Sequence, residues 1–306
     1  MQNDALSKTP TDALGELRGE IDRIDLAMHR LLMQRGEIID RLIEVKRAQG
    51  GGCAFRPDRE AQMMRALVER HHGLLPLDAV EGIWRVIVST FTFVQAPYSV
   101  HADDSGGDAQ MRDSARFHFG FTVPYVPHHG AVAVIDAVSA SSGDLGVLRS
   151  LGGSGDGAWW LRLVGERAPK IIARLPFVER PDHPAGLPVF VVAKPATDFY
   201  AQDIALYSVS LPRWAHDVPA AVAAAGGEIL ASAPIARSLR TGVLQPPYEG
   251  TGHALLIAAP ARTASGELPR HLKECGVEAP VVEAIGGHAE RFEMNEARAG
   301  VFAPKG

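Results

Sequence analysis

Two positively charged residues, Arg35 and Lys46, stand within a pattern that otherwise predicts a buried helix face. Apolar residues recur at alternating steps of three and four along residues 14–45, and Arg35 occupies a position where the pattern predicts another apolar residue. Because a guanidinium is never deprotonated, burying it without an anion costs several kcal/mol. Lys46 comes close to three helical turns later, on the same face and roughly 16 Å along the axis. The pair therefore favours binding of a small molecule with more than one negative charge.

Four further polar residues complete the candidate site. Arg59 and Glu60 follow one another shortly after a glycine run, and Gln95 lies two residues before a proline. Arg18 lies about 100° round the helix from Arg35, so we expect it to serve the site of an antiparallel partner chain. The set contains no nucleophile paired with a base, no metal cluster and no phosphate loop. The catalysis that it can supply is positioning and electrostatic stabilisation.

Three helices must position these residues. We expect the first over residues 11–49, ended by the run Gly50–Gly52, and the second from Pro57 to residues 71–73. The third is expected over residues 77–95, ended by a proline. The residues of the third helix expected to face the core are Val80, Ile83, Trp84, Ile87, Val88 and Phe91. The first helix is much longer than the other two, so we expect a dimer to cover it.

The spacing of these residues resembles a known family. The segment begins LRGEIDRID and continues through Arg35, Lys46, RPDRE, IWR and Gln95, and in this order it resembles the all-helical chorismate mutase family. The resemblance covers residues 11–97, about a third of the chain. It implies an intertwined helical homodimer that binds chorismate and rearranges it to prephenate without a cofactor or a metal.

The resemblance also implies a role for each matching residue. Arg35, Arg59 and the Arg18 of the partner chain would bind the substrate carboxylates. Lys46 and Gln95 would contact the ether oxygen that gains negative charge as its C–O bond breaks, and Glu60 would hold the ring hydroxyl. The residues expected to act in catalysis are Lys46, Gln95 and Arg35.

Two positions depart from the family pattern. Arg56 stands where the family often has an acidic residue, and Phe91 stands where a small polar residue is usual. Neither departure removes one of the principal cations. A purely structural alternative remains for the whole segment, in which the helices form a coiled-coil dimer and have no catalytic role.

The remaining two thirds of the chain have a mixed α/β pattern. We expect an acidic, glycine-containing linker over residues 101–111 and an α/β domain over residues 112–199, with short apolar runs at 131–135, 170–175 and 189–193. Residues 200–295 alternate strand and helix patterns in the βαβ–βαβ order of a ferredoxin-like α+β domain. Disordered tails are expected at residues 1–10 and 296–306. The expected fold is therefore multidomain.

The domain order resembles that of the bifunctional mutase–prephenate dehydratases. Residues 112–199 are similar to a truncated dehydratase domain, but the strand comparable to that family's Thr-Arg-Phe motif reads Val189 to Val192. We therefore expect no dehydratase activity. Residues 200–295 are similar to an ACT regulatory domain that lacks the usual phenylalanine-binding sequences. The alternatives are a bifunctional enzyme, or a non-catalytic dimeric sensor whose ACT-like domain binds an amino acid.

Composition limits the class of protein. Lys and Arg total 31 against 36 Asp and Glu, a net charge of −5, which argues against binding to nucleic acid or to an anionic membrane surface. The two cysteines are too few for a disulfide framework and fit the reducing cytoplasm. The sequence shows no signal peptide and no apolar run long enough to span a membrane, so we expect a cytoplasmic protein.

Overall fold

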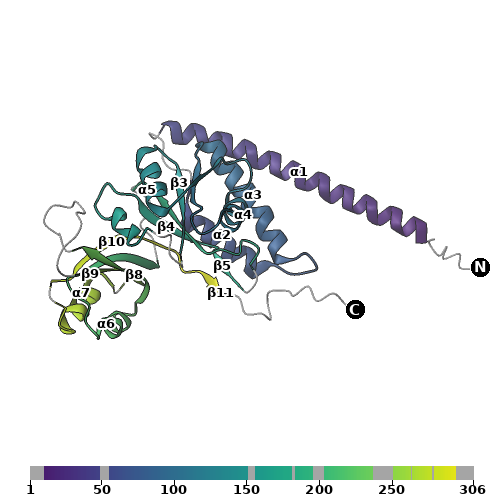
Figure 1. The fold of residues 1–306 in the computed structure, drawn as a ribbon. Coiled ribbons are helices and arrows are strands. Elements are labelled where there is room, and N and C mark those ends of the chain that lie inside the picture. The colour runs from purple at the N-terminus through teal and green to yellow at the C-terminus, as the bar shows by residue number, and fades with distance from the viewer. Residues whose placement is uncertain are drawn as a thin grey trace, which may run out of the picture. The chain divides into compact units, whose positions relative to one another are not determined.

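The chain forms two structural units. The first reaches Gly52 and contains a single helix, α1 (Pro10–Ala48), and the second begins at Cys53. Figure 1 shows the course of the chain in this computed structural model. The expected tails lie outside the described residues, except that Pro10 begins α1. The structure describes residues 10–48, 55–150, 156–180, 183–195, 203–236, 251–262, 264–277 and 279–293.

The three N-terminal helices agree with the bounds predicted from the sequence. Helix α2 (Pro57–Arg70) has proline in its first turn, where the missing N–H has no helical partner to lose. Helix α3 (Leu77–Gln95) ends just before Pro97, which cannot continue a helix. The 39 residues of α1 far exceed the roughly 11–12 residues of an average globular helix.

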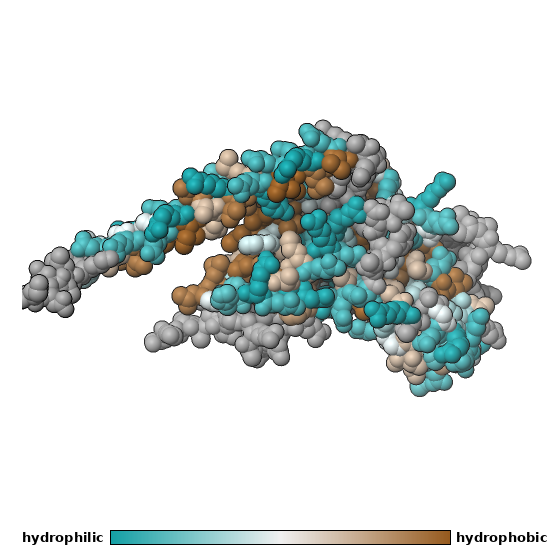
Figure 2. Space-filling model, turned by 180° about the vertical axis from the view of Figure 1, so that it is seen from behind, coloured by the Kyte–Doolittle hydropathy of each residue, from teal (hydrophilic) through white to brown (hydrophobic). Residues whose placement is uncertain are grey.

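Helix α1 exposes its apolar stripe. Leu14, Leu17 and Leu31 are 54%, 56% and 64% exposed, although these are the residues that the sequence pattern assigns to a packed face. Figure 2 shows brown, apolar side chains along this helix. An exposed face of this length is typical of a surface that packs against another polypeptide.

A nine-stranded sheet runs through the second unit in the order β2-β1-β3-β6-β4-β10-β7-β9-β8. Strand β1 pairs in parallel with both β2 and β3, whereas β6 runs antiparallel to β3 and to β4. Helices α4 (Asp108–Phe119) and α5 (Ala131–Ala140) connect the parallel strands. The first strands in chain order are β1 (Val100–Asp103), β2 (Tyr125–His128), β3 (Leu145–Arg149), β4 (Lys170–Leu175), β5 (Val178–Glu179) and β6 (Val189–Ala193). A 3-10 helix, η1 (Trp159–Leu163), precedes β4.

One prediction for this region is wrong. Residues 101–111, expected to be a linker, instead contain most of β1 and the start of α4. The pairing of β1 with two neighbours explains this, because it buries Ala102 and Asp103 completely. The apolar run at 131–135 belongs to α5. Its buried residues recur at helical spacing, at positions 131, 134, 135 and 138.

The C-terminal part continues the same sheet with a β-α-β-β-α-β order. Neighbouring strands from β10 through β7 and β9 to β8 are all antiparallel. Strand β10 also pairs in parallel with β4, where Gly286 lies opposite Ile171. The segments expected as separate domains, 112–199 and 200–295, are thus joined by strand pairing. The elements are β7 (Ile204–Leu211), α6 (Val218–Ala224), β8 (Glu228–Ala236), β9 (Thr251–Pro260), α7 (Ala264–Glu274), β10 (Val281–His288) and β11 (Phe292–Glu293).

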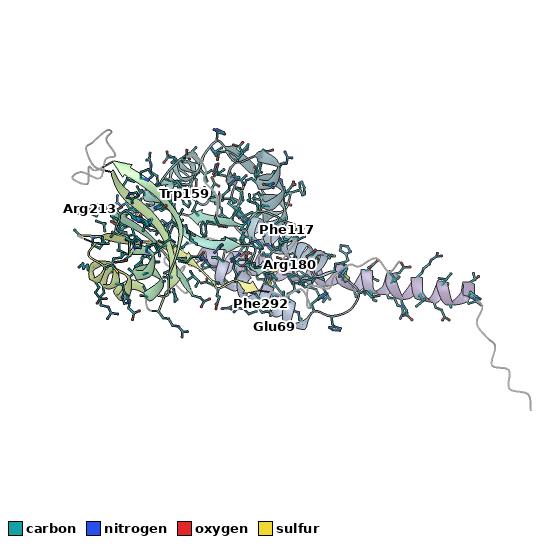
Figure 3. The ribbon with its side chains drawn as sticks, turned by 60° about the horizontal axis from the view of Figure 1, so that its bottom comes forward. Glu69, Phe117, Trp159, Arg180, Arg213 and Phe292 are labelled. Carbon is teal, nitrogen blue, oxygen red and sulfur yellow. The ribbon has the colours of Figure 1, made fainter. Side chains whose placement is uncertain are left out.

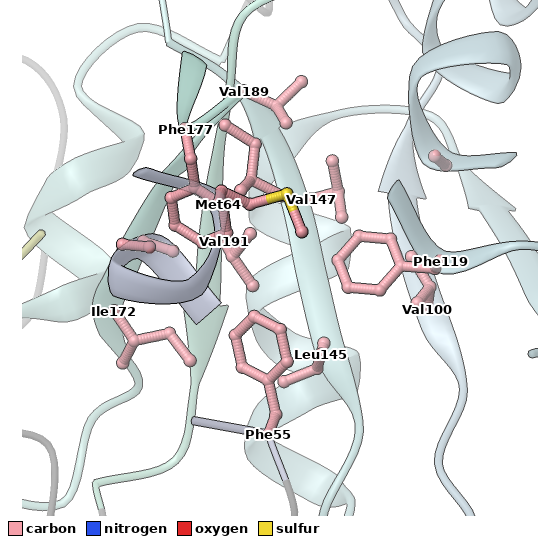
Figure 4. Packing of buried hydrophobic residues seen from close by; sticks show 14 of the residues in the cluster. Phe55, Met64, Val100, Phe119, Leu145, Val147, Ile172, Phe177, Val189 and Val191 are labelled. Atoms are coloured by element: carbon pink, nitrogen blue, oxygen red, sulfur yellow. The ribbon is translucent and has the colours of Figure 1, made fainter. Parts of the chain in front are cut away.

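Helices α2 and α3 share a hydrophobic core with the first strands of the sheet. Phe55 and Met64, from the α2 region, lie in one buried cluster with Leu145 of β3 and Val191 of β6. Figure 4 shows these side chains together with Phe119 of α4. The second and third helices of the segment expected to be an independent helical domain therefore pack with the α/β region in this structure.

Two further clusters cover the C-terminal strands. Along β7, Leu206 belongs to one cluster, whereas Tyr207 and Val209 belong to another, as the two-residue period of a strand requires. Helices α6 and α7 contribute to the cluster of Tyr207. Trp159 and Trp160 lie in the cluster of Leu206 and are almost fully buried, so these tryptophans are core residues.

Candidate active site

Helix α1 carries three of the six candidate residues. The helix is unbroken from Arg18 through Arg35 to Lys46, so the helical spacing inferred from the sequence holds along its whole length. Arg18 is exposed and Arg35 is half-buried. Lys46 lies in the last turn, and its side chain is outside the described part of the chain.

Helix α2 carries Arg59 and Glu60 in its first turn. The two side chains lie on different faces, because Arg59 is exposed and Glu60 is only 5% exposed. Glu60 accepts a hydrogen bond of 2.7 Å from Nη1 of Arg85, which projects from α3. The family resemblance assigns Glu60 to the ring hydroxyl of the substrate. In the structure, the Glu60 carboxylate also forms an ion pair with Arg85.

Arg85 is fixed by a second group of contacts. Its Nε and Nη2 both donate to the carbonyl oxygen of His118 on α4, at 3.0 and 2.7 Å. Burial raises the pKa of the Glu60 carboxyl, and the charge and hydrogen bond of Arg85 oppose this shift. The planar fork of one arginine thus connects three helices, and it orients the Glu60 carboxylate.

Gln95 ends α3. Its side-chain Nε2 donates to the carbonyl oxygen of Phe91 one turn earlier, at 3.0 Å. Phe91 and Arg56, which depart from the family pattern, are both half-buried. The structure thus places Glu60 and Gln95 on neighbouring helices of the second unit, whereas Arg18, Arg35 and Lys46 belong to the first unit.

A second buried ionic group was not predicted from the sequence. Arg180 donates from Nη1 to Oε2 of Glu81 at 2.8 Å and from Nε to Oδ1 of Asp78 at 2.8 Å, and His183 lies 3.4 Å from Glu81. Burial alone would raise the pKa of Glu81, but the hydrogen bonds and charges of His183 and Arg180 lower it. Figure 3 labels Arg180, which joins α3 to the segment after β5.

His118 lies beside this group without taking part in it. Its ring stacks on that of His183 at 6.2 Å between centroids, and both of its ring nitrogens are buried without a hydrogen-bond partner among the described residues. Burial, followed by the charges of Arg85 and His183, holds the pKa of His118 well below its usual value. His118 is therefore neutral at physiological pH.

The charged residues of α3 carried a sequence signal that was missed. Glu81 and Arg85 are four residues apart, so they must share a helix face. Of the residues predicted to face the core, Val80 and Val88 are buried and Ile83 is exposed. The buried residues of α3 also include Glu81 and Arg85. Apolar character alone missed Glu81 and Arg85, because their buried charges are compensated by partners from other segments.

Residues 17–96 match the family model for chorismate mutase type II. This match contains all six candidate residues of the mutase region and confirms the predicted resemblance of the N-terminal third.

Two curated relatives of the chain are named bifunctional chorismate mutase/prephenate dehydratase. A bifunctional chorismate mutase/prephenate dehydratase from Neisseria gonorrhoeae is 30% identical over 131 residues, which cover 43% of this chain and 34% of the relative. One from Aquifex aeolicus is 30% identical over 142 residues, covering 45% of this chain and 38% of the relative. The chain thus spans little more than a third of the length of these relatives.

The sequence identity to solved structures is lower than to these relatives. A prephenate dehydratase from Streptococcus mutans has a TM-score of 0.40 and 11% identity, covering 64% of this chain and 100% of that chain. A prephenate dehydratase in complex with L-Phe from Arthrobacter aurescens has a TM-score of 0.39 and 11% identity, covering 63% of this chain and 90% of that chain.

The strand comparable to the dehydratase motif has no polar side chain. All five residues of β6 are buried and apolar, so this strand presents no hydroxyl or guanidinium to a ligand. Within the described ranges, no group of three or more His, Cys, Asp or Glu side chains is arranged to hold a metal ion. Nor does any helix there have the length and apolar character needed to cross a membrane.

Proposed function

We propose that this protein is a chorismate mutase, which rearranges chorismate to prephenate in the biosynthesis of aromatic amino acids. The observation that carries the proposal is the set of cations at family spacing on one continuous helix, Arg18, Arg35 and Lys46, within residues that match the mutase family model. The reaction is an intramolecular rearrangement, so it requires no nucleophile, metal or cofactor. A binding site with fixed charges is sufficient for it.

Each residue has an electrostatic role in this proposal. Arg35 and Arg59 bind the substrate carboxylates, for which the forked guanidinium is well suited. Lys46 and Gln95 stabilise the ether oxygen, on which negative charge accumulates as its C–O bond breaks. Glu60 accepts a hydrogen bond from the ring hydroxyl, while Arg85 holds its carboxylate in place.

A homodimer completes the proposed site. The apolar stripe of α1 is exposed along its length in the single chain, and a second copy of the helix would cover it. Arg18 lies about 100° round the helix from Arg35, so an Arg18 acting at the same substrate would come from the partner chain. The proposed partners are therefore chorismate and a second copy of this chain, in the cytoplasm.

A direct assay tests the proposal. The purified full chain is incubated with chorismate, and the loss of chorismate and the formation of prephenate are followed in the absence of metal. Arg35→Ala and Lys46→Ala should each lower kcat/KM by about a hundredfold or more, because each removes charge stabilisation at the reacting atoms. Arg41→Ala removes an exposed cation from the same helix and should leave the rate unchanged. Parent-like rates in both site variants would reject the assigned site.

A bifunctional enzyme is the second candidate, because both curated relatives carry the dehydratase name. The apolar strand β6 argues against it in this chain. The same reaction mixture separates the two candidates: phenylpyruvate formed from prephenate at neutral pH would establish the dehydratase.

We interpret the β-α-β-β-α-β region as ACT-like. If the chain shows no mutase activity but an amino acid raises its melting temperature, the non-catalytic sensor is the better description.

A further inference from the structure

A pocket of about 470 Å³ lies where the first half of the sheet meets the β-α-β-β-α-β region. It shares no residue with the proposed mutase site. One part of its wall is aliphatic, from Ile204, Ala258, Ala259 and Pro260, and another part is charged. The other lining residues are Arg174, Glu179, Gly226, Gly227, Glu228, His288, Glu290 and Arg291.

Strand pairing brings the charged side chains together. Strands β4 and β10 run in parallel from the Ile171–Gly286 pair, so Arg174 and His288 reach the same end of the sheet. The short strand β11 pairs with β5, and this places Arg291 beside Glu179. An ion pair of 2.6 Å joins Nη2 of Arg291 to the Glu179 carboxylate. The position of these side chains is therefore set by the backbone.

Two guanidinium nitrogens of the pocket-lining residues have no hydrogen-bond partner among the described residues. Nε of Arg174 and Nη1 of Arg291 are buried and have no hydrogen bond to the described part of the chain. Arg174 also forms no ion pair with a described residue, and its guanidinium lies 5.8 Å from the ring centre of the fully buried Phe190. Burial, followed by the charge of Arg291, lowers the pKa of Arg174. Buried donors are nearly always satisfied in native proteins, and guanidinium donors bond most strongly to an anionic acceptor.

His288 supplies a third buried atom, which is a hydrogen-bond acceptor and not a donor. Its Nδ1–H donates to the carbonyl oxygen of Ala289 at 2.8 Å, and burial lowers the pKa of the ring to about 4. The neutral ring therefore has an unprotonated Nε2, which can only accept a hydrogen bond. This atom is buried and has no hydrogen-bond partner in the described part of the chain, and His288 is 4% exposed. Its ring lies 6.3 Å from that of Phe190, the same ring that the Arg174 guanidinium approaches.

The two arginine donors and the histidine acceptor indicate the chemical groups of a fitting ligand. We propose that this pocket binds a small aliphatic 2-hydroxycarboxylate, whose carboxylate accepts from Arg174 and Arg291 and whose hydroxyl donates to Nε2 of His288. The aliphatic wall takes the side chain of the ligand. A neutral hydroxyl fits better than an ammonium group, because the charges of Arg174 and Arg291 act on His288 more strongly than the opposing charge of Asp203. Glu228 and Glu290 are exposed, so water solvates their charges and weakens their effect on the buried atoms.

Calorimetric titration of the full chain with two acids tests the proposal. The acids are 2-hydroxyisocaproate and 4-methylpentanoate, which differ only by the hydroxyl. The hydroxy acid should bind about tenfold more tightly, the effect of one buried hydrogen bond. Arg174→Gln should weaken both acids by at least about tenfold, whereas His288→Leu should abolish only the preference for the hydroxy acid.

The matched control is Arg213→Gln, which removes an exposed arginine just beyond the other end of β7 and should leave both affinities unchanged. Circular dichroism verifies that each variant is folded, and His288→Phe replaces His288→Leu if the latter does not fold. Equal binding of the two acids by the parent chain, tighter binding of leucine than of the hydroxy acid, or no binding at millimolar concentration would each overturn the proposal. Chorismate turnover is not part of the measurement, so this proposal and the mutase proposal can fail separately.

Discussion

Arg85 holds the Glu60 carboxylate through a hydrogen bond of 2.7 Å between two side chains that are 1% and 7% exposed. This ion pair lies at the junction of α2, α3 and α4, since the same guanidinium also donates twice to the carbonyl oxygen of His118. A candidate site residue is thus positioned by an arginine that lies outside the predicted set. The pair makes the stability of the fold and the orientation of Glu60 depend on the same contact.

Replacing Arg85 with alanine should strongly destabilise the protein. It would leave Glu60 buried without its counter-ion and the His118 carbonyl without its donors, a loss of about 3–5 kcal/mol in the free energy of unfolding. Urea denaturation followed by circular dichroism measures this loss. Arg112→Ala is the control, because it breaks an exposed ion pair with Asp108 and should cost no more than about 1 kcal/mol. Equal stability of the two variants would contradict the structural role of Arg85.

The sequence was sufficient to predict the elements whose signals are local. Helices α1, α2 and α3 follow from apolar periodicity, from Pro57 and from Pro97, and each ends within a residue or two of its expected bound. Strands β7 to β10 and helix α6 follow in the same way, because each is a short apolar run between turn residues.

Features that depend on distant partners could not be predicted. The 101–111 segment looked like a linker because Asp103, Asp104 and two glycines are polar or small. The parallel neighbours of β1 that bury Asp103 come from segments far along the chain. The contacts of Glu81 with Arg180 and His183 likewise span about a hundred residues, so no local spacing reveals them. Of the candidate site, the residue types and helices were predictable, but the Arg85 contact to Glu60 was not.

Substituting Gly286 should separate the two halves of the sheet. Its φ is +123°, and a Cβ atom there would lie 2.0 Å from the carbonyl oxygen of Ile171 on β4. Gly286→Ala should therefore lower the free energy of unfolding by at least about 2 kcal/mol, through backbone strain and the clash together. Thermal unfolding detects the effect.

The control for this variant lies in α7. Gly266 has no atom within 4 Å of a built Cβ and no positive φ, so Gly266→Ala should stabilise its helix by about 0.5–1 kcal/mol. A Gly286→Ala protein as stable as the parent would show that β10 does not approach β4 this closely.

His288 should make the protein sensitive to acid. Burial lowers its pKa from 6.5 to about 4, so between these values the unfolded chain binds a proton that the folded chain does not. The contribution is fully present above about pH 6.5 and is lost progressively as the pH falls toward 4. Between pH 7 and pH 5 it amounts to roughly 2 kcal/mol. The His288→Gln variant should lose that much less stability than the parent over this interval in urea titrations. The same slope in both proteins would show that His288 titrates normally.

Mixing two inactive variants should restore activity if Arg18 acts across a dimer interface. Arg18→Ala and Arg35→Ala each leave every homodimeric site without one of its carboxylate ligands. In a heterodimer, one of the two sites combines an intact Arg35 with an intact Arg18 from the other chain. Equimolar subunit exchange gives half heterodimers, so about a quarter of the parent sites should recover, as measured by chorismate loss. Light scattering verifies that both variants remain dimeric. Recovery is absent if Arg18 serves the site of its own chain, because every site then lacks one arginine whatever the pairing.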